Sequence, residues 1–201
     1  MMLQQVVTHR IRTNHRLYDT RETYSQESLD KLRLVVSQDN AVRIINEYLH
    51  QAEALSSGIL NAMAAAQTFA QNAKVGYRNM WSDRDKYLNL RILSYHPGPE
   101  KKASGDTIMT TAKHTDATWL TLLWNDDIKG LHIQPGNQDI VASSPTQGAL
   151  LVNTGNVMSE HSGNFYRAVC HWVLRNKETE VKTRVSMPFF FDRNGGKTGG
   201  C

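Results

Sequence analysis

The chain has 201 residues, a length that fits one ordinary domain whose core is large enough to need no disulfide or metal. With 40% hydrophobic residues, 21% charged residues and a mean hydropathy of −0.49, the composition is that of a globular chain and not of a disordered or membrane protein. The weakly polar stretch 52–73 contains Glu53, Gln67 and Gln71, so it predicts no membrane-spanning helix.

The net charge is +4, from 23 Lys and Arg residues against 19 Asp and Glu residues. The basic residues are spread along the chain, a distribution that does not favour nucleic-acid binding. The first residues contain scattered arginines and no continuous apolar run, so we expect no secretory signal. Cys170 and Cys201 cannot form a CxxC metal knuckle or a secreted disulfide framework, and we expect both as reduced thiols. These features predict a cytoplasmic protein with no nucleic-acid or membrane partner.

A helical pattern begins at Asp39, which is a plausible N-cap. Apolar residues then recur at spacings of three and four as far as Met63, the pattern of a helix that buries one stripe. Gly58 is expected to bend or divide this helix, because glycine in a helix interior costs about 1 kcal/mol relative to alanine. A shorter helix is predicted at 28–37.

From Tyr87 onward the hydrophobic period changes to two, the period of strands. Seven short runs predict an all-β sandwich or barrel. The chain is therefore divided into an N-terminal helical region (1–86), a β-rich core (87–193) and a flexible tail (194–201). The seven runs are YLNLRILSYH, WLTLLW, GLHIQP, DIVAS, GALLVN, FYRAVCHWVL and TRVSMPFFF.

His114 and Asp116 form the first candidate site, because residues i and i+2 of a strand point to the same side. A single His-x-Asp pair is close to chance. His171 lies in another strand-like run, where antiparallel pairing could bring it beside the first pair. Two imidazoles and one carboxylate form the facial triad of non-haem Fe(II) oxygenases, which leaves positions open for a co-substrate and O2. Zinc enzymes use the same ligand set, so the ligands alone do not name the metal.

The remaining histidines are not expected to bind this metal. His132 lies in the strand-like run GLHIQ, and His161 lies in the Ser-, Asn- and Gly-rich stretch HSGN, which is typical of a loop. Cys170 alternates with His171 and is expected on the opposite side of its strand.

Arg184 and Ser186 form a second i, i+2 pair. A guanidinium binds two carboxylate oxygens at once, and a neighbouring hydroxyl donates a further hydrogen bond. Such a pair suits the far carboxylate of a dicarboxylic acid that is anchored at a metal. Without the triad, a surface Arg and Ser at the end of a hairpin would be the simpler interpretation.

These motifs occur in order in HTDATWLTLLWNDDIKGLHIQ, GALLVNTGNVMSEHSGNFYRAVCHWV and TRVSMPFFF. Over 87–193 the chain thereby resembles the 2-oxoglutarate/Fe(II) dioxygenase superfamily of the isopenicillin N synthase-like type. The resemblance implies a mainly β fold with N-terminal α-helices, whose core is a double-stranded β-helix, or jelly roll. It also implies Fe(II) held by one set of residues and the C5 carboxylate of 2-oxoglutarate held by another. The implied iron ligands are His114, Asp116 and His171, and the implied carboxylate clamp is Arg184 and Ser186.

Some positions depart from the family pattern. Ser94-Tyr95-His96-Pro97 stands where many relatives have Asn-Tyr-Tyr-Pro, so the resemblance assigns Ser94 and His96 to 2-oxoglutarate near its C1 end. Trp172 replaces the usual arginine after the distal histidine. Fewer residues precede His114 than is typical of the family.

The activity that the resemblance implies is oxidation of a small organic substrate, by hydroxylation, desaturation or cyclisation. It is coupled to conversion of 2-oxoglutarate and O2 into succinate and CO2, with ascorbate as a candidate reductant. Two alternatives stay open. The same scaffold hosts oxidases that bind substrate to iron and need no 2-oxoglutarate, and the short N-terminal side allows a truncated, inactive protein that only binds a metal or partner. The sequence does not name the substrate, because pocket walls vary on a shared scaffold.

Overall fold

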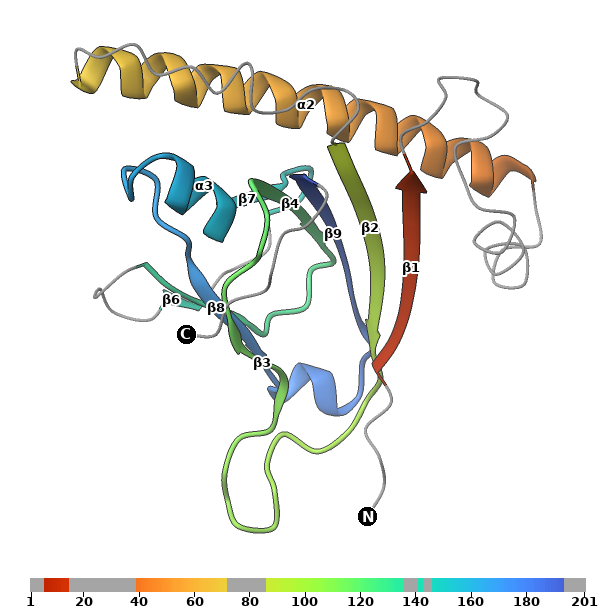
Figure 1. Cartoon of the computed structure of the whole chain (residues 1–201). Helices are drawn as coiled ribbons and strands as arrows, with labels where there is room; N and C mark the ends of the chain where they lie inside the picture. Colours follow the sequence, from red (N-terminus) through yellow and green to blue (C-terminus); the bar gives the residue numbers. More distant parts are fainter. Residues whose placement is uncertain (1–5, 15–38, 72–85, 136–140, 143–145, 194–201) are drawn as a thin grey trace.

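The structure is a computed structural model that describes residues 6–14, 39–71, 86–135, 141–142 and 146–193. Two antiparallel β-sheets and one long helix dominate these residues (Figure 1). The major sheet has five strands in the order β1 (Val6–Asn14), β2 (Lys86–Tyr95), β9 (Arg184–Arg193), β4 (Leu120–Asn125) and β7 (Leu151–Thr154). The minor sheet has four, in the order β3 (Met109–His114), β8 (Cys170–Leu174), β5 (Leu131–Gln134) and β6 (Val141–Ala142).

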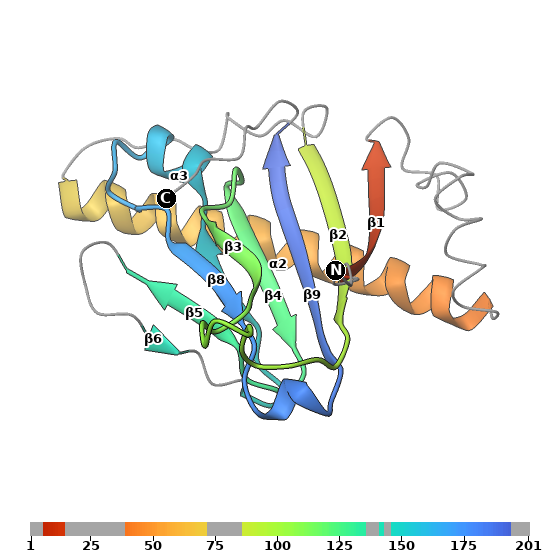
Figure 2. The same cartoon turned by 90° about the horizontal axis from the view of Figure 1, so that it is seen from below.

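Three helical elements accompany the sheets in the described part of the chain. The long helix α2 (Asp39–Gln71) runs across the outer face of the major sheet (Figure 2). A short helix, α3 (Asn156–His161), follows β7, and a 3-10 turn (Glu178–Glu180) precedes β9. No helix in the described ranges is both long and apolar enough to cross a membrane.

Helix α2 begins at Asp39, where the sequence predicts its start. It continues through Gly58 to Gln71 as one helix, so the predicted division at Gly58 is wrong. Leu49, Ala52 and Leu60 form its buried stripe. Tertiary burial of this stripe outweighs the cost of one glycine, since each fully buried leucine contributes about 1.5–3 kcal/mol. The stripe packs against Leu88, Leu90, Trp119, Leu120, Leu122, Met158, Phe189 and Phe191.

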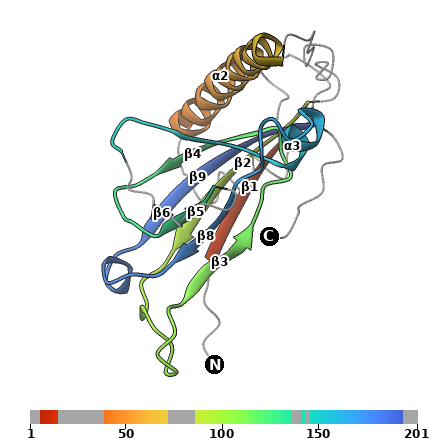
Figure 3. The ribbon, with the colours of Figure 1, turned by 90° about the vertical axis from the view of Figure 1, so that its left-hand side faces the viewer.

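Because side chains alternate along a strand, the other residues of β2 point to the inner face of the major sheet, towards the minor sheet. In β2, Leu88 and Leu90 pack towards α2, so Leu93 and Tyr95 point to the minor sheet. The two sheets form two layers (Figure 3). A second, smaller core lies between them and is formed by residues of β2, β4, β5, β7 and β8. It contains Leu93, Tyr95, Leu123, Leu131, Ile133, Leu151 and Val173. The inner faces of both sheets therefore enclose the space in which a site can form.

Each of the seven predicted runs contains a strand. In the run FYRAVCHWVL only the second half forms a strand, because β8 starts at Cys170. The sequence did not predict β1, which pairs with β2 over its whole length from Val6↔Tyr95 to Asn14↔Tyr87. The region expected to be helical over 1–86 therefore contributes an edge strand to the major sheet. The predicted helix at 28–37 and the tail at 194–201 lie outside the described residues.

Cys170 lies on β8 directly before His171 and so takes the opposite face of that strand, as its alternation predicts. It is disulfide-bonded, which corrects the expectation of a reduced thiol at this position.

Candidate active site

Two histidines meet where β3 and β8 pair. His114 is the last residue of β3 and lies directly opposite His171 in the antiparallel register. Their ring centroids are 4.3 Å apart, with 55° between the ring planes. Residues that lie 57 positions apart in sequence are thus cross-strand neighbours, as the antiparallel pairing predicted from the sequence requires.

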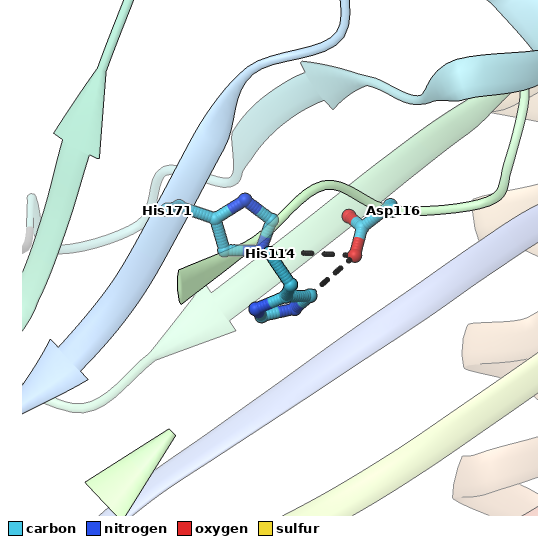
Figure 4. A group of neighbouring side chains, drawn as sticks. All are labelled: His114, Asp116 and His171. Atoms are coloured by element: carbon cyan, nitrogen blue, oxygen red, sulfur yellow. Dashed lines mark ion pairs between the residues drawn. The ribbon is translucent and has the colours of Figure 1, made fainter. Parts of the chain in front are cut away.

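Asp116 completes the group (Figure 4). Its Oδ1 lies 3.7 Å from Nε2 of His114 and 3.7 Å from Nε2 of His171. The three potential ligand atoms lie within 4.8 Å of one another. Asp116 follows the end of β3 and lies in the loop that leads to β4, so the chain bend at this point, and not strand alternation alone, directs the carboxylate at the histidines. The side chain of Asp116 is only 5% exposed.

Both imidazoles are oriented through their second nitrogen. Nδ1 of His114 lies 2.8 Å from the carbonyl oxygen of Ala112, and Nδ1 of His171 lies 3.0 Å from that of Val169. A carbonyl only accepts hydrogen bonds, so each Nδ1 carries the hydrogen and donates it. Each Nε2 of a neutral ring then keeps its lone pair and directs it at the centre of the group. This arrangement is typical of metal-binding histidines.

The second oxygen of Asp116 is held from the major sheet. Oδ2 accepts a hydrogen bond from Thr121 Oγ1 at 2.7 Å and another from Asn153 Nδ2 at 2.9 Å. The sequence does not predict either residue as part of the site. Thr121 lies in the run LTLL and Asn153 in the run LVN, each at a position whose side chain points to the inner face. Their place in this alternation is the only sequence feature that indicates a role at the site.

Gly155 allows the Asp116 loop to pack this closely. A Cβ atom at Gly155 would lie 2.3 Å from the carbonyl oxygen of Thr118 and 2.7 Å from that of Asp116, closer than real Cβ atoms approach. The next amide, that of Asn156, donates to the carbonyl oxygen of Asp116 at 2.7 Å. The start of α3 therefore fixes the backbone of the third ligand candidate.

Arg184 lies deeper between the sheets and is only 2% exposed. Its Nη2 donates to Asn125 Oδ1 at 2.5 Å, and its Cζ lies 5.2 Å from the centre of the Tyr95 ring. Its Nε and Nη1 are buried without a hydrogen-bond partner in the described part of the chain. Burial lowers the pKa of the guanidinium, while the negative potentials of Tyr95 and Asp126 act in the opposite direction. A buried arginine with two unused donors is costly alone and is suited to a carboxylate.

Ser186 shares this inner face. It lies opposite Leu93 of β2 and Asn125 of β4 in the sheet register and is buried. Arg184 lies opposite Tyr95. The structure thus places Arg184 and Ser186 side by side on one face, as the i, i+2 pattern predicts.

The structure does not bring Ser94 and His96 to this group. Ser94 lies opposite Val185 in the register, so it points to the other face of the sheet, and His96 is exposed. Tyr95, between them, is the residue of this motif that reaches the interior, where its hydroxyl lies 3.1 Å from Thr111 Oγ1. The prediction that Ser94 and His96 face the site is therefore wrong, and their neighbour Tyr95 faces it instead.

An apolar cavity of about 270 Å³ adjoins the triad. It lies between the inner faces of β4 and β7 and those of β5 and β8. His171 and Asn153 are its polar residues, and the others are Leu123, Leu131, Ile133, Pro135, Leu151, Val152 and Val169.

Two other histidines lie apart from the triad. His132 stacks on Trp172 at 5.8 Å between ring centroids, on the outer face of the minor sheet. His161 is the last residue of α3, not a loop residue as predicted, and packs 4.6 Å from the Trp119 ring.

Comparisons with known proteins agree with this geometry. Residues 85–193 match the family described as the 2OG-Fe(II) oxygenase superfamily. The 2-oxoglutarate-dependent dioxygenase citB of Monascus ruber is 28% identical over 161 residues, which cover 80% of this chain and 47% of citB. Gibberellin 3-beta-dioxygenase 1 of Pisum sativum is 33% identical over 102 residues, 51% of this chain and 25% of that protein. The chain thus spans about half or less of the length of these relatives.

A solved structure shares the fold. The dioxygenase for auxin oxidation of rice superimposes with a TM-score of 0.64 at 19% identity, over 93% of this chain and 58% of that chain. The predicted fold class, mainly β with a double-stranded β-helix core, is confirmed. The match to the family covers more than half of the chain and includes the His-x-Asp, distal histidine and Arg-x-Ser motifs. The chain is therefore a member of the 2OG-Fe(II) oxygenase superfamily.

Proposed function

We propose that this chain is a dioxygenase that uses non-haem Fe(II) and 2-oxoglutarate to oxidise a small organic substrate. His114, Asp116 and His171 would hold the metal. Arg184 and Ser186 would hold the C5 carboxylate of 2-oxoglutarate. The observation that carries the proposal is the buried Arg184 fork with two unused donors, on the face that also carries the residues bonded to Asp116.

The donor set fits Fe(II). Two neutral imidazole nitrogens and one carboxylate oxygen form the facial triad that leaves positions open on that metal. Both imidazoles are held in the tautomer that a metal requires, and all three ligand atoms already converge. When bound, Fe(II) supplies the reduction of O2 that is coupled to oxidative decarboxylation of 2-oxoglutarate.

The distance between the two parts of the site suits a dicarboxylic acid. Thr121 bonds Asp116 and Asn125 bonds Arg184, and both residues lie on β4. Four residues of a strand span about 13 Å at roughly 3.3 Å per residue. A metal beside Asp116, a five-carbon diacid and the Arg184 side chain together can bridge this distance between Thr121 and Asn125. A carboxylate on a directly bound substrate would satisfy the same donors, so release of succinate, and not Arg184 alone, separates this proposal from an oxidase that needs no 2-oxoglutarate.

The proposal is tested by metal-dependent binding of 2-oxoglutarate. Calorimetric titration under anaerobic conditions is expected to show 2-oxoglutarate binding to the Mn(II)-loaded protein and binding at least about tenfold weaker without metal, because chelation and the arginine clamp then no longer act together. Succinate, which lacks the keto group, is the control and is expected to bind weakly in both cases. Equal affinity for 2-oxoglutarate with and without Mn(II) would contradict the proposal.

The cavity beside His171 supports a small substrate with an apolar part. Its lining is almost entirely aliphatic, and a volume of about 270 Å³ is near the lower end of small-molecule sites. The absence of a nucleic-acid or membrane partner and the cytoplasmic location remain predictions.

Filling the cavity is expected to exclude a small apolar probe. Leu151→Trp places a large ring among the aliphatic side chains, so indole, tested by NMR titration on the protein with Mn(II) replaced by diamagnetic Zn(II), should bind at least about tenfold more weakly than to wild type. Val181→Trp is the control, because Val181 is exposed and lies outside the cavity lining. Unchanged indole affinity in a folded Leu151→Trp variant would show that this cavity does not take apolar ligands.

A further inference from the structure

The two oxygens of the Asp116 carboxylate have different surroundings. Oδ2 accepts hydrogen bonds from Thr121 and Asn153, whereas Oδ1 faces Nε2 of both histidines. An ionised carboxylate offers about four lone-pair sites, two on each oxygen. The two donors therefore occupy the lone pairs of Oδ2, and the lone pairs of Oδ1 stay directed at the centre of the triad.

The two donors are held by the sheet. Thr121 of β4 and Asn153 of β7 lie directly opposite each other in the antiparallel register, so both side chains project from the same inner face. Thr121 is buried. The carboxylate is thus gripped from the major sheet, while the histidines come from the minor sheet.

A further hydroxyl fixes the direction of this hydrogen bonding. Thr118 Oγ1 lies 3.1 Å from Thr121 Oγ1. The single hydroxyl hydrogen of Thr121 goes to the ionised carboxylate, which cannot donate. Thr118 is therefore the donor to Thr121, and the chain of hydrogen bonds runs from Thr118 through Thr121 to Asp116. Such a chain strengthens each of its bonds.

We propose that Thr121 and Asn153 are positioning residues that reserve Oδ1 as the single Asp116 donor to the metal. This inference rests on the proposed function of the triad. A carboxylate that bound the metal through both oxygens would have to break both hydrogen bonds to Oδ2. With Oδ2 held by its two donors, Asp116 would offer the metal one oxygen and would leave positions open for a co-substrate and O2.

The two residues contribute little to the hydrophobic core. The adjacent Leu120 and Leu122 pack into the main cluster on the other face of β4, and Asn153 lies on the edge strand of the sheet. Removing the donors should therefore weaken metal binding more than folding. This difference separates positioning from a purely structural role.

The test is titration of the apoprotein with Co(II), followed by its visible absorption, together with thermal unfolding of the apoprotein. Thr121→Val and Asn153→Ala are each expected to raise the Co(II) dissociation constant about 10–100-fold, the usual cost of losing an outer partner of a metal ligand. Thr121→Ser keeps the hydroxyl and is expected to bind Co(II) within about threefold of wild type. Thr154→Val is the matched control, because its hydroxyl bonds the carbonyl oxygen of Arg167 and not Asp116.

The outcomes separate this inference from the proposed function. If Asp116→Ala loses Co(II) binding while Thr121→Val and Asn153→Ala both bind it within about twofold of wild type, the inference is overturned and the metal site stands. If Asp116→Ala itself binds Co(II) like wild type, the metal site of the proposed function fails. Should Thr121→Val not fold, Asn153→Ala on the edge strand decides the matter by the same criterion.

Discussion

Replacing Asp116 with alanine is expected to lower turnover and Fe(II) affinity by more than about 100-fold, the upper end of what the loss of an outer partner costs a metal site. Asp116 supplies the only charged ligand atom of the triad, and a methyl group cannot replace it. The fold should persist, because Asp116 lies in a loop between β3 and β4. The donors on Thr121 and Asn153 lose their acceptor, at a cost of about 1–3 kcal/mol each if they stay buried and unsatisfied.

Iron content after anaerobic loading and thermal unfolding of the same samples would measure both effects. Asp127→Ala is the matched control, since it removes an exposed carboxylate from the turn after β4. We expect this control to keep wild-type iron stoichiometry. Near-normal turnover with one bound iron in Asp116→Ala would refute the ligand assignment.

The second large effect is expected from Arg184→Lys, which should raise the KM for 2-oxoglutarate by about 10–100-fold. Lysine keeps the charge and loses the planar fork that binds two carboxylate oxygens. Hydrogen bonds to a charged group are worth about 1.5–3 kcal/mol, and each 1.4 kcal/mol is a factor of ten. Fe(II) affinity should stay within about threefold, because the triad's ligand atoms belong to other residues.

Arg175→Lys is a demanding control for this variant. Arg175 is also buried, but its guanidinium donates to the carbonyl oxygens of His96 and Thr179. Its loss should therefore lower the unfolding temperature and leave the KM for 2-oxoglutarate unchanged. If Arg184→Lys instead loses iron while its dependence on 2-oxoglutarate is unaltered, Arg184 has a structural role and the clamp assignment fails.

The sequence predicts those parts of the site whose chemistry can be recognised from the residue types themselves. The three triad residues are chemically distinctive and lie in or beside strand-like runs, and antiparallel pairing brings His114 opposite His171. The Arg184 and Ser186 pair is predictable for the same reason, because i and i+2 share a face wherever the strand begins.

The phase of a strand relative to the interior is harder to predict. In β2 both faces are buried, one against α2 and one between the sheets, so alternation alone does not say which residues face inward. The resemblance assigned Ser94 and His96 to the site, and alternation could not correct it, although the register places Tyr95 opposite Arg184 on the inner face. Thr121 and Asn153 were missed because common polar residues in apolar runs give no sign of their partner until the register is known.

Long-range pairing explains the other differences. β1 pairs with a strand more than seventy residues away, and nothing in its local sequence signals that partner. α3 is six residues long and begins after Gly155, where close approach to the Asp116 loop, and not helix propensity, determines the backbone. In α2 the tertiary burial of one stripe overrides the local signal of Gly58.

The most direct test of the central claim is the release of succinate from 2-oxoglutarate by the purified chain with Fe(II), ascorbate and O2 and without added substrate. We expect slow uncoupled turnover, with succinate and CO2 formed in equal amounts, that requires both Fe(II) and O2 and is abolished in Asp116→Ala. Absence of succinate from a folded chain that contains one iron and binds 2-oxoglutarate would contradict the account and leave a protein that binds the metal and the diacid without catalysis.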